Sequence, residues 1–225
     1  MRIIMFKGYS KTGKTSTVAA LVSELRRRGY TVGTVKDIHF EGYEADDPNT
    51  DTYKHRKAGA RRVTALGPRD TSIIVDRHMK IEEILKYYKE DFVILEGDSG
   101  LKCPNIISGR TTDDLDKRMD ENTIAFTGII AGNTNENNGE PALKEYKGMP
   151  VINGITEVEK MADLVEKKAK HQASATGDID VELTIGGEEI FMVPFVKNTI
   201  KNVVVGAVMA LDGYEEGKEI VIKIK

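Results

Sequence analysis

The stretch Gly8-Tyr9-Ser10-Lys11-Thr12-Gly13-Lys14-Thr15 matches the P-loop pattern G-x-x-x-x-G-K-[ST] at every fixed position. An apolar run at residues 3–6 precedes it and predicts a buried strand, and residues 17–28 follow with apolar side chains at helical spacing. A strand, a glycine-rich loop and a helix in this order direct backbone N–H groups and a helix N-terminus at phosphates. The stretch therefore predicts a nucleoside triphosphate site. The alternative is an ordinary strand-to-helix turn.

Each part of the loop has a predicted role. Backbone N–H groups of residues 10–14 would surround the β-phosphate, the Lys14 ammonium would bridge the β- and γ-phosphates, and the Thr15 hydroxyl would bind Mg²⁺. The predicted nucleotide-binding residues of this segment are Gly8, Ser10, Lys11, Thr12, Gly13, Lys14, Thr15 and Ser16.

Short apolar runs alternate with helical patterns along the first 170 residues. This alternation predicts an α/β fold with a mostly parallel sheet and helices on both faces. The predicted strands are residues 3–6, 31–35, 72–75, 92–95, 124–130 and 151–152, and the predicted helices are 17–28, 81–88 and 157–170.

The pattern changes after residue 170. Residues 1–170 are predicted to form the nucleotide-binding domain, and the small polar residues 171–178 a linker. In residues 179–225, a Gly-Gly turn between alternating runs, a helix opened by Pro194 and a last strand at 220–224 predict a small β-β-α-β unit.

Composition excludes several classes of partner. The net charge is −3 and there is no basic tail, so we expect neither nucleic acid nor a membrane surface as a partner. No apolar run approaches the ~20 residues of a membrane-spanning helix. The single cysteine, Cys103, rules out a disulfide within the chain and suggests a reducing cytoplasm, where we expect it to be a buried small apolar residue.

A second motif lies at residues 92–97, Phe-Val-Ile-Leu-Glu-Gly. Four apolar residues followed by an acid resemble a Walker B strand, which would deliver Glu96 to the carboxyl edge of the sheet beside the P-loop. There Glu96 would hold Mg²⁺ or a water on it, or orient a water for attack. The alternative is an acid that only caps the next segment. Asp98 is a weaker second candidate.

Charged residues also follow the predicted strand at 31–35. Lys36 would contact phosphate and Asp37 would join the Mg²⁺ shell, because ligands bind at the carboxyl ends of strands in such sheets. A solvated loop is the alternative for this segment. His39 is equally compatible with a structural and a functional role.

These segments together resemble the molybdopterin-guanine dinucleotide biosynthesis protein B family. The resemblance rests on the P-loop, on Val35-Lys36-x-x-His39, on Asp47-Pro48-x-x-Asp51-x-Tyr53-x-His55-Arg56-x-Ala58-Gly59-Ala60 and on Leu95-Glu96-Gly97, in this order. It is strong over residues 1–100 and loose over 101–170. The segment from Val181 is similar to C-terminal extensions of archaeal members.

The resemblance implies a cytoplasmic, homodimeric GTP-binding protein with weak GTPase activity, accessory to the guanylyltransferase that joins GMP to molybdopterin. GTP and Mg²⁺ would be its cofactors, and Lys14 and Glu96 the residues that act in hydrolysis. It also implies a pocket for the pterin or a partner beside the loop, lined by Asp51, Tyr53, His55 and Arg56.

The chain departs from the family pattern in two places. Near Lys36 the family has two or three histidines, whereas this chain has Asp37 and Phe40 around a single His39. After Gly97 the family continues with an aromatic residue and a lysine, whereas Asp98-Ser99-Gly100-Leu101-Lys102 follows here. The pocket is therefore less determined than the nucleotide site.

No base-reading motif selects GTP over ATP in the residues themselves. Asn133 would contact the base, or it is an ordinary turn asparagine. A P-loop small-molecule kinase or ligase is the main alternative function. A metal-insertion GTPase would need a His-rich or Cys-x-x-Cys metal site, and the one Cys and scattered His of this chain argue against that function. The intact Lys14 and Thr15 disfavour a pure interaction module.

Overall fold

The computed structural model describes residues 1–132, 142–169, 181, 183–185, 188–190, 192, 194–208 and 211. The chain divides into two compact units, Met1–His171 and Gln172–Lys225. The first unit contains the P-loop.

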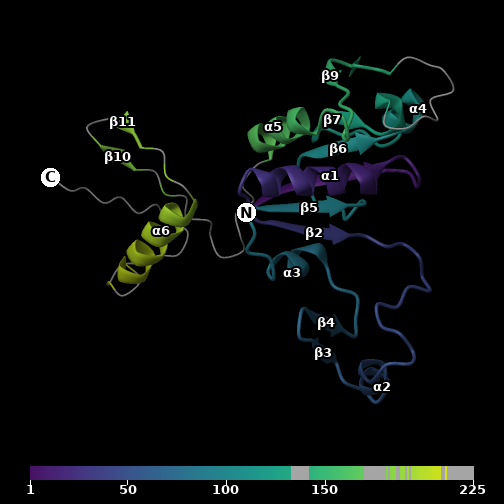
Figure 1. Cartoon of the computed structure of the whole chain (residues 1–225), viewed down its shortest axis with the longest axis vertical. Helices are drawn as coiled ribbons and strands as arrows, with labels where there is room; N and C mark the ends of the chain where they lie inside the picture. Colours follow the sequence, from purple (N-terminus) through teal and green to yellow (C-terminus); the bar gives the residue numbers. More distant parts are fainter. Residues whose placement is uncertain are drawn as a thin grey trace. The chain divides into compact units, whose positions relative to one another are not determined.

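A five-stranded parallel sheet forms the centre of the first unit (Figure 1). Its order is β2-β5-β1-β6-β7, so the strand before the P-loop lies in the middle. The mostly parallel α/β sheet predicted from the sequence is confirmed. The strands are β1 (Arg2–Gly8), β2 (Val32–Lys36), β5 (Phe92–Glu96), β6 (Asn105–Ser108) and β7 (Thr123–Thr127).

Helices cover both faces of this sheet. Alternation along β1 sends Ile4 and Phe6 into the cluster beneath α1 (Lys14–Arg27) and α5 (Val158–Lys168). The neighbouring residues Ile3 and Met5 point to the opposite face, where α3 (Ile81–Leu85) packs. A third cluster joins α4 (Thr112–Asp116) to β6 and β7 through Leu115. Because both faces are buried, β1 and β5 contain continuous apolar runs in the sequence.

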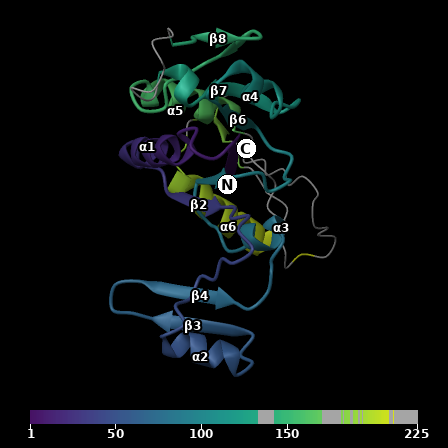
Figure 2. The ribbon, with the colours of Figure 1, turned by 90° about the vertical axis from the view of Figure 1, so that its right-hand side faces the viewer.

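Residues 72–75 do not belong to the central sheet, which corrects the sequence prediction. They lie in β4 (Thr71–Val75), which pairs antiparallel with β3 (Arg62–Leu66), a strand that was not predicted. Most of β4 is exposed, whereas β5 in the parallel sheet is buried along its whole length. The hairpin and α2 (Asp51–Lys57) form a lobe at one end of this unit, which both Figure 1 and Figure 2 show.

Three other boundaries differ from the prediction. The strand expected at 124–130 ends at Thr127, because Gly128 takes φ 101° and opens the short 3₁₀ helix η1 (Ile129–Ala131). Residues 151–152 form no strand; Val151 makes one isolated bridge to Phe126 and follows the antiparallel pair β8 (Glu145–Tyr146) and β9 (Met149–Pro150). The buried strand β6 was not predicted; its sequence, Asn-Ile-Ile-Ser, contains only two apolar residues.

The second unit contains a hairpin and a helix. β10 (Thr184–Ile185) pairs antiparallel with β11 (Glu188–Glu189), and α6 (Pro194–Val208) begins at the predicted proline. The predicted linker at 171–178 and the last strand at 220–224 lie outside the described residues. Among the helices that the structure describes, none has the length and apolar character needed to cross a bilayer.

Cys103 is a buried residue of the α3 side of the core, with 6% of its surface exposed. Burial raises the pKa of its thiol to about 11. The expected role as a small apolar core residue is therefore confirmed.

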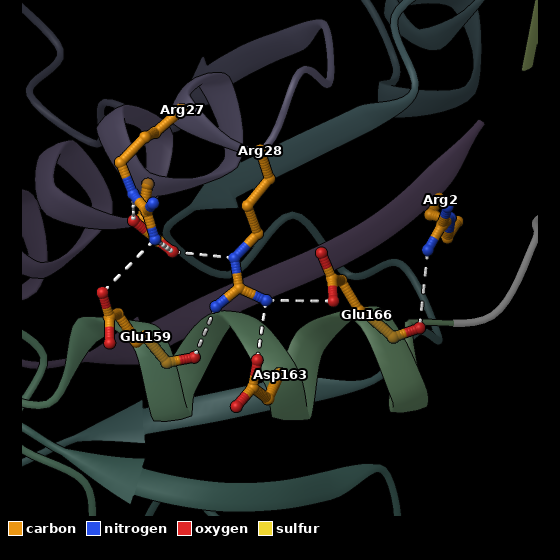
Figure 3. Close-up of polar contacts among 7 residues, drawn as sticks. Arg2, Arg27, Arg28, Glu159, Asp163 and Glu166 are labelled. Carbon is orange, nitrogen blue, oxygen red and sulfur yellow. Dashed lines mark hydrogen bonds and ion pairs between the residues drawn. The ribbon is translucent and has the colours of Figure 1, made fainter. Parts of the chain in front are cut away.

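A network of charged residues joins the end of α1 to α5 (Figure 3). Glu24 is 5% exposed and accepts hydrogen bonds from Arg27 Nε at 2.7 Å and from Arg28 Nε at 2.7 Å. Arg28 also reaches Asp163 at 2.7 Å and Glu166 at 3.0 Å on α5. The hydrogen bonds from the two arginines lower the pKa of Glu24 to about 2, so the carboxylate stays charged.

Glu24→Gln is expected to lower the free energy of unfolding at neutral pH, because two arginines lose their shared carboxylate. The pKa of Glu24 is lower in the folded state than its usual value of 4.5, so its contribution is complete above pH 4.5. It is lost as the pH falls from 4.5 toward 2. Urea denaturation at pH 7 and pH 3 checks this: the difference between wild type and variant should shrink at pH 3.

Glu145→Gln is the control, since Glu145 lies on an exposed strand of the same unit. A Glu24→Gln deficit equally large at pH 7 and at pH 3 would contradict the role of the charge.

Candidate functional site

The loop between β1 and α1 is tightly held against β6. A Cβ at Gly8 would lie 2.1 Å from the Ser108 backbone oxygen, and Gly8 has φ 144°, so this position requires glycine. The buried Thr12 donates to the Tyr9 carbonyl at 3.0 Å, and Ser108 Oγ donates to the Thr12 carbonyl at 2.9 Å. Gly13 has φ 94° and precedes the first residue of α1. The loop is therefore preorganised by a hydrogen bond of its own and by one from β6.

The Lys14 ammonium lies inside the curve of this loop. It donates to the Gly8 carbonyl at 2.9 Å and to the Tyr9 carbonyl at 2.5 Å. Burial lowers the pKa of Lys14; the charge of Glu96 opposes this effect, and the positive charges of Lys36 and Arg118 add to it. An anion bound in the loop would relieve this electrostatic cost.

The structure brings Thr15, Lys36 and Glu96 together beside the loop. Thr15 Oγ1 donates to Glu96 Oε1 at 2.5 Å, and Lys36 Nζ donates to the same oxygen at 2.8 Å. Lys36 and Glu96 end neighbouring strands and are paired in register, which places both at the carboxyl edge of the sheet. Burial favours a raised pKa for Glu96, but the bonds from Lys36 and Thr15 outweigh it and hold the pKa below its usual value.

The chemistry of these groups fits a Mg²⁺ ion. The Thr15 hydroxyl and the Glu96 carboxylate supply oxygen ligands, which Mg²⁺ prefers. Within the described residues, no group of three or more His, Cys, Asp or Glu side chains could hold a metal. Two oxygen ligands are nevertheless enough in nucleotide sites, because phosphates and water complete the coordination there.

Asp37 lies next to this group, but its carboxylate points elsewhere. Its backbone N–H donates to the Glu96 carbonyl at 2.8 Å, while its carboxylate lies 3.2 Å from His39 Nε2. In the described part of the chain, no hydrogen bond or ion pair joins the Asp37 carboxylate to Thr15 or Glu96. A direct role of Asp37 at the metal stays a prediction.

The four residues predicted to line a pocket beside the loop all lie on α2, outside the central sheet. Asp51, Tyr53, His55 and Arg56 belong to α2, whose N-terminus is capped by Thr50. Arg56 holds α2 in the hairpin lobe, since its guanidinium lies 3.3 Å from Asp76. The lobe lies away from α1 in both Figure 1 and Figure 2. The structure therefore does not place these residues beside the loop, and their binding role stays a prediction.

The remaining residues of the predicted nucleotide site are Ser10, Lys11, Ser16 and Asn133. Ser10, Lys11 and Ser16 are exposed on the loop and the first turn of α1. Asn133 lies outside the described residues. The side chain of Asn153 donates to the Ala131 and Gly132 carbonyls at 3.2 and 2.9 Å, so it fixes the backbone that leads to Asn133.

Arg118 is a candidate site residue that the sequence reasoning missed. Its guanidinium lies 4.5 Å from the centre of the Tyr9 ring, and its charge reaches Lys14. It follows α4, which Leu115 anchors to β6 and β7. No local motif marks this arginine, since only the packing of α4 brings it to the loop.

Comparisons with known proteins agree on one family. The profile described as "Molybdopterin guanine dinucleotide synthesis protein B" (MobB) matches residues 3–129. A curated relative from Methanocaldococcus jannaschii, named a putative molybdopterin-guanine dinucleotide biosynthesis adapter protein, is 25% identical over 237 residues, covering 100% of this chain and 97% of the relative. The adapter protein of Escherichia coli K12 is 28% identical over 102 residues, which cover 42% of this chain and 58% of that protein.

Solved structures share the fold. Bacillus subtilis MobB superposes with a TM-score of 0.58 at 19% identity, covering 76% of this chain and 100% of that one. The MobB homologue from Bacillus stearothermophilus gives a TM-score of 0.55 at 20% identity, covering 75% of this chain and 100% of that one.

Proposed function

Since the chain belongs to the molybdopterin guanine dinucleotide synthesis protein B family, we propose that it is a GTP-binding adapter in the biosynthesis of molybdopterin guanine dinucleotide. The proposal rests on one observation: Thr15 donates a hydrogen bond to Glu96 beside a loop whose carbonyls already surround the Lys14 ammonium. The names of the relatives from M. jannaschii and E. coli support the pathway.

Each residue of the site has a role in this proposal. Lys14 contacts the β- and γ-phosphates, and the N–H groups of residues 10–14 surround the β-phosphate. Thr15 would hold Mg²⁺, and Glu96 would hold the metal or one of its waters; the ion would supply positive charge beside the phosphates. Hydrolysis of GTP is slow in this proposal. Within the described site, Glu96 is the one carboxylate hydrogen-bonded to the loop, and it would have to serve both the metal and the attacking water.

The nucleotide acts as a signal to a partner rather than as a consumed substrate. Bound GTP and Mg²⁺ order the segment around Lys36 and Asp37, and this order raises the affinity for the molybdopterin guanylyltransferase. The protein acts in the cytoplasm as a homodimer. The α2 segment and the second unit supply surfaces for the pterin or the partner.

A binding experiment with three nucleotide conditions tests this proposal. The full chain is titrated by calorimetry with the molybdopterin guanylyltransferase of the same organism, without nucleotide and with non-hydrolysable analogues of GTP or ATP. We expect binding to tighten about tenfold with the GTP analogue, a coupling typical of nucleotide switches.

Two results would contradict the adapter role. One is equal affinity of the two proteins in all three conditions. The other is rapid nucleotide turnover stimulated by a small metabolite in the absence of any protein partner, which would indicate a kinase or ligase instead.

A further inference from the structure

The ammonium of Lys36 lies where the two oxygens assigned to Mg²⁺ converge. Lys36 Nζ is 2.8 Å from Glu96 Oε1 and 3.2 Å from Thr15 Oγ1. The Thr15 hydroxyl itself donates a hydrogen bond to Glu96 Oε1. Lys36 comes from the last residue of β2, and the parallel register with Glu96 fixes its reach. One positive group therefore contacts both predicted protein ligands of the metal.

An ammonium and a divalent cation compete for the same oxygens. The Glu96 carboxylate is 11% exposed and needs a positive partner, because a triphosphate bound beside an uncompensated carboxylate would be repelled. The Lys36 side chain is 55% exposed, so it can leave Glu96 for water or phosphate at little cost. The two partners thus differ: the carboxylate is fixed and the ammonium is free to move.

We propose that Lys36 is a tethered cation that takes the place of Mg²⁺ at Thr15 and Glu96, so that the nucleotide binds with or without the metal. This inference rests on the proposed nucleotide site and adds a regulatory property to it. With Mg²⁺ present, the exposed Lys36 ammonium would leave Glu96 for water. Lys36 is therefore a positioning residue that sets the metal dependence of binding.

The test measures the affinity for a fluorescent GTP analogue with Mg²⁺ and with a chelator in wild type and in Lys36→Met. In the variant we expect the ratio of the two dissociation constants to rise about tenfold, since one charge-assisted bond to the site is lost only in the metal-free state. Lys36→Arg should restore the wild-type ratio. The matched control is Lys160→Met, because Lys160 is equally exposed and lies 3.6 Å from a carboxylate of Glu157.

Other outcomes would overturn the inference. An unchanged ratio in Lys36→Met, or the same change in Lys160→Met, would show that Lys36 does not replace the metal. Failure of the wild type to bind the analogue in either condition would refute the nucleotide site itself. The failure of this inference and the failure of the nucleotide site are distinguishable, because an unchanged ratio can be measured only if the wild type binds the analogue. Circular dichroism of each variant confirms that the fold is retained.

Discussion

Lys14→Ala is expected to weaken triphosphate binding about 100-fold. The Lys14 ammonium already donates to the Gly8 and Tyr9 carbonyls inside the loop, so it is positioned for two phosphate oxygens without a large movement. Each charge-assisted hydrogen bond contributes ~1.5 kcal/mol or more, and two of them account for about two decades in the dissociation constant. Calorimetric titration with GTP in the presence of Mg²⁺ measures the effect.

The control for Lys14→Ala is Lys160→Ala on α5, which removes an exposed lysine of the same unit that pairs with Glu157. The Lys14→Ala variant should also have a slightly higher free energy of unfolding, since burial and the charges of Lys36 and Arg118 destabilise the charged form of Lys14 in the absence of an anion. Equal GTP affinity in Lys14→Ala and wild type would refute the phosphate assignment.

Gly8→Ala is expected to destabilise the fold by about 2–5 kcal/mol, because it combines backbone strain with overpacking. The new methyl group would lie 2.1 Å from the Ser108 backbone oxygen, and a backbone oxygen of a central strand cannot move aside as a flexible side chain can. Gly8 pairs with Ser108 in the β1–β6 ladder, so relief of the clash would open the middle of the sheet. Urea denaturation followed by circular dichroism measures the loss.

Gly29→Ala separates the two causes. Gly29 also has a positive φ, 92°, but a Cβ there would meet nothing within 4 Å. We expect only the strain, about 1–2 kcal/mol. A Gly8→Ala variant no less stable than Gly29→Ala would show that β1 and β6 can separate near the loop, and would contradict the preorganised geometry.

Local patterns predicted the elements that carry the nucleotide site. β1, the loop and α1 are consecutive in the chain, and β5 with Glu96 is an apolar run that ends in a single acid. Their geometry depends on short-range backbone preferences and on burial of whole strands, both of which are visible in the sequence. Residues 72–75 were correctly predicted as a strand, but not its place in a separate hairpin, because an exposed, partly apolar strand has the same composition as one at a sheet edge.

The sequence by itself determined the loop, the parallel α/β fold and the identity of Lys14, Thr15 and Glu96 as a set. Only the tertiary structure decided that Lys36 contacts both Thr15 and Glu96, that Arg118 reaches the loop, and that α2 lies in a separate lobe. The physical reason is distance along the chain. A loop's shape follows from its neighbouring residues, whereas contacts across 60 residues depend on strand register and helix packing, which no local pattern encodes.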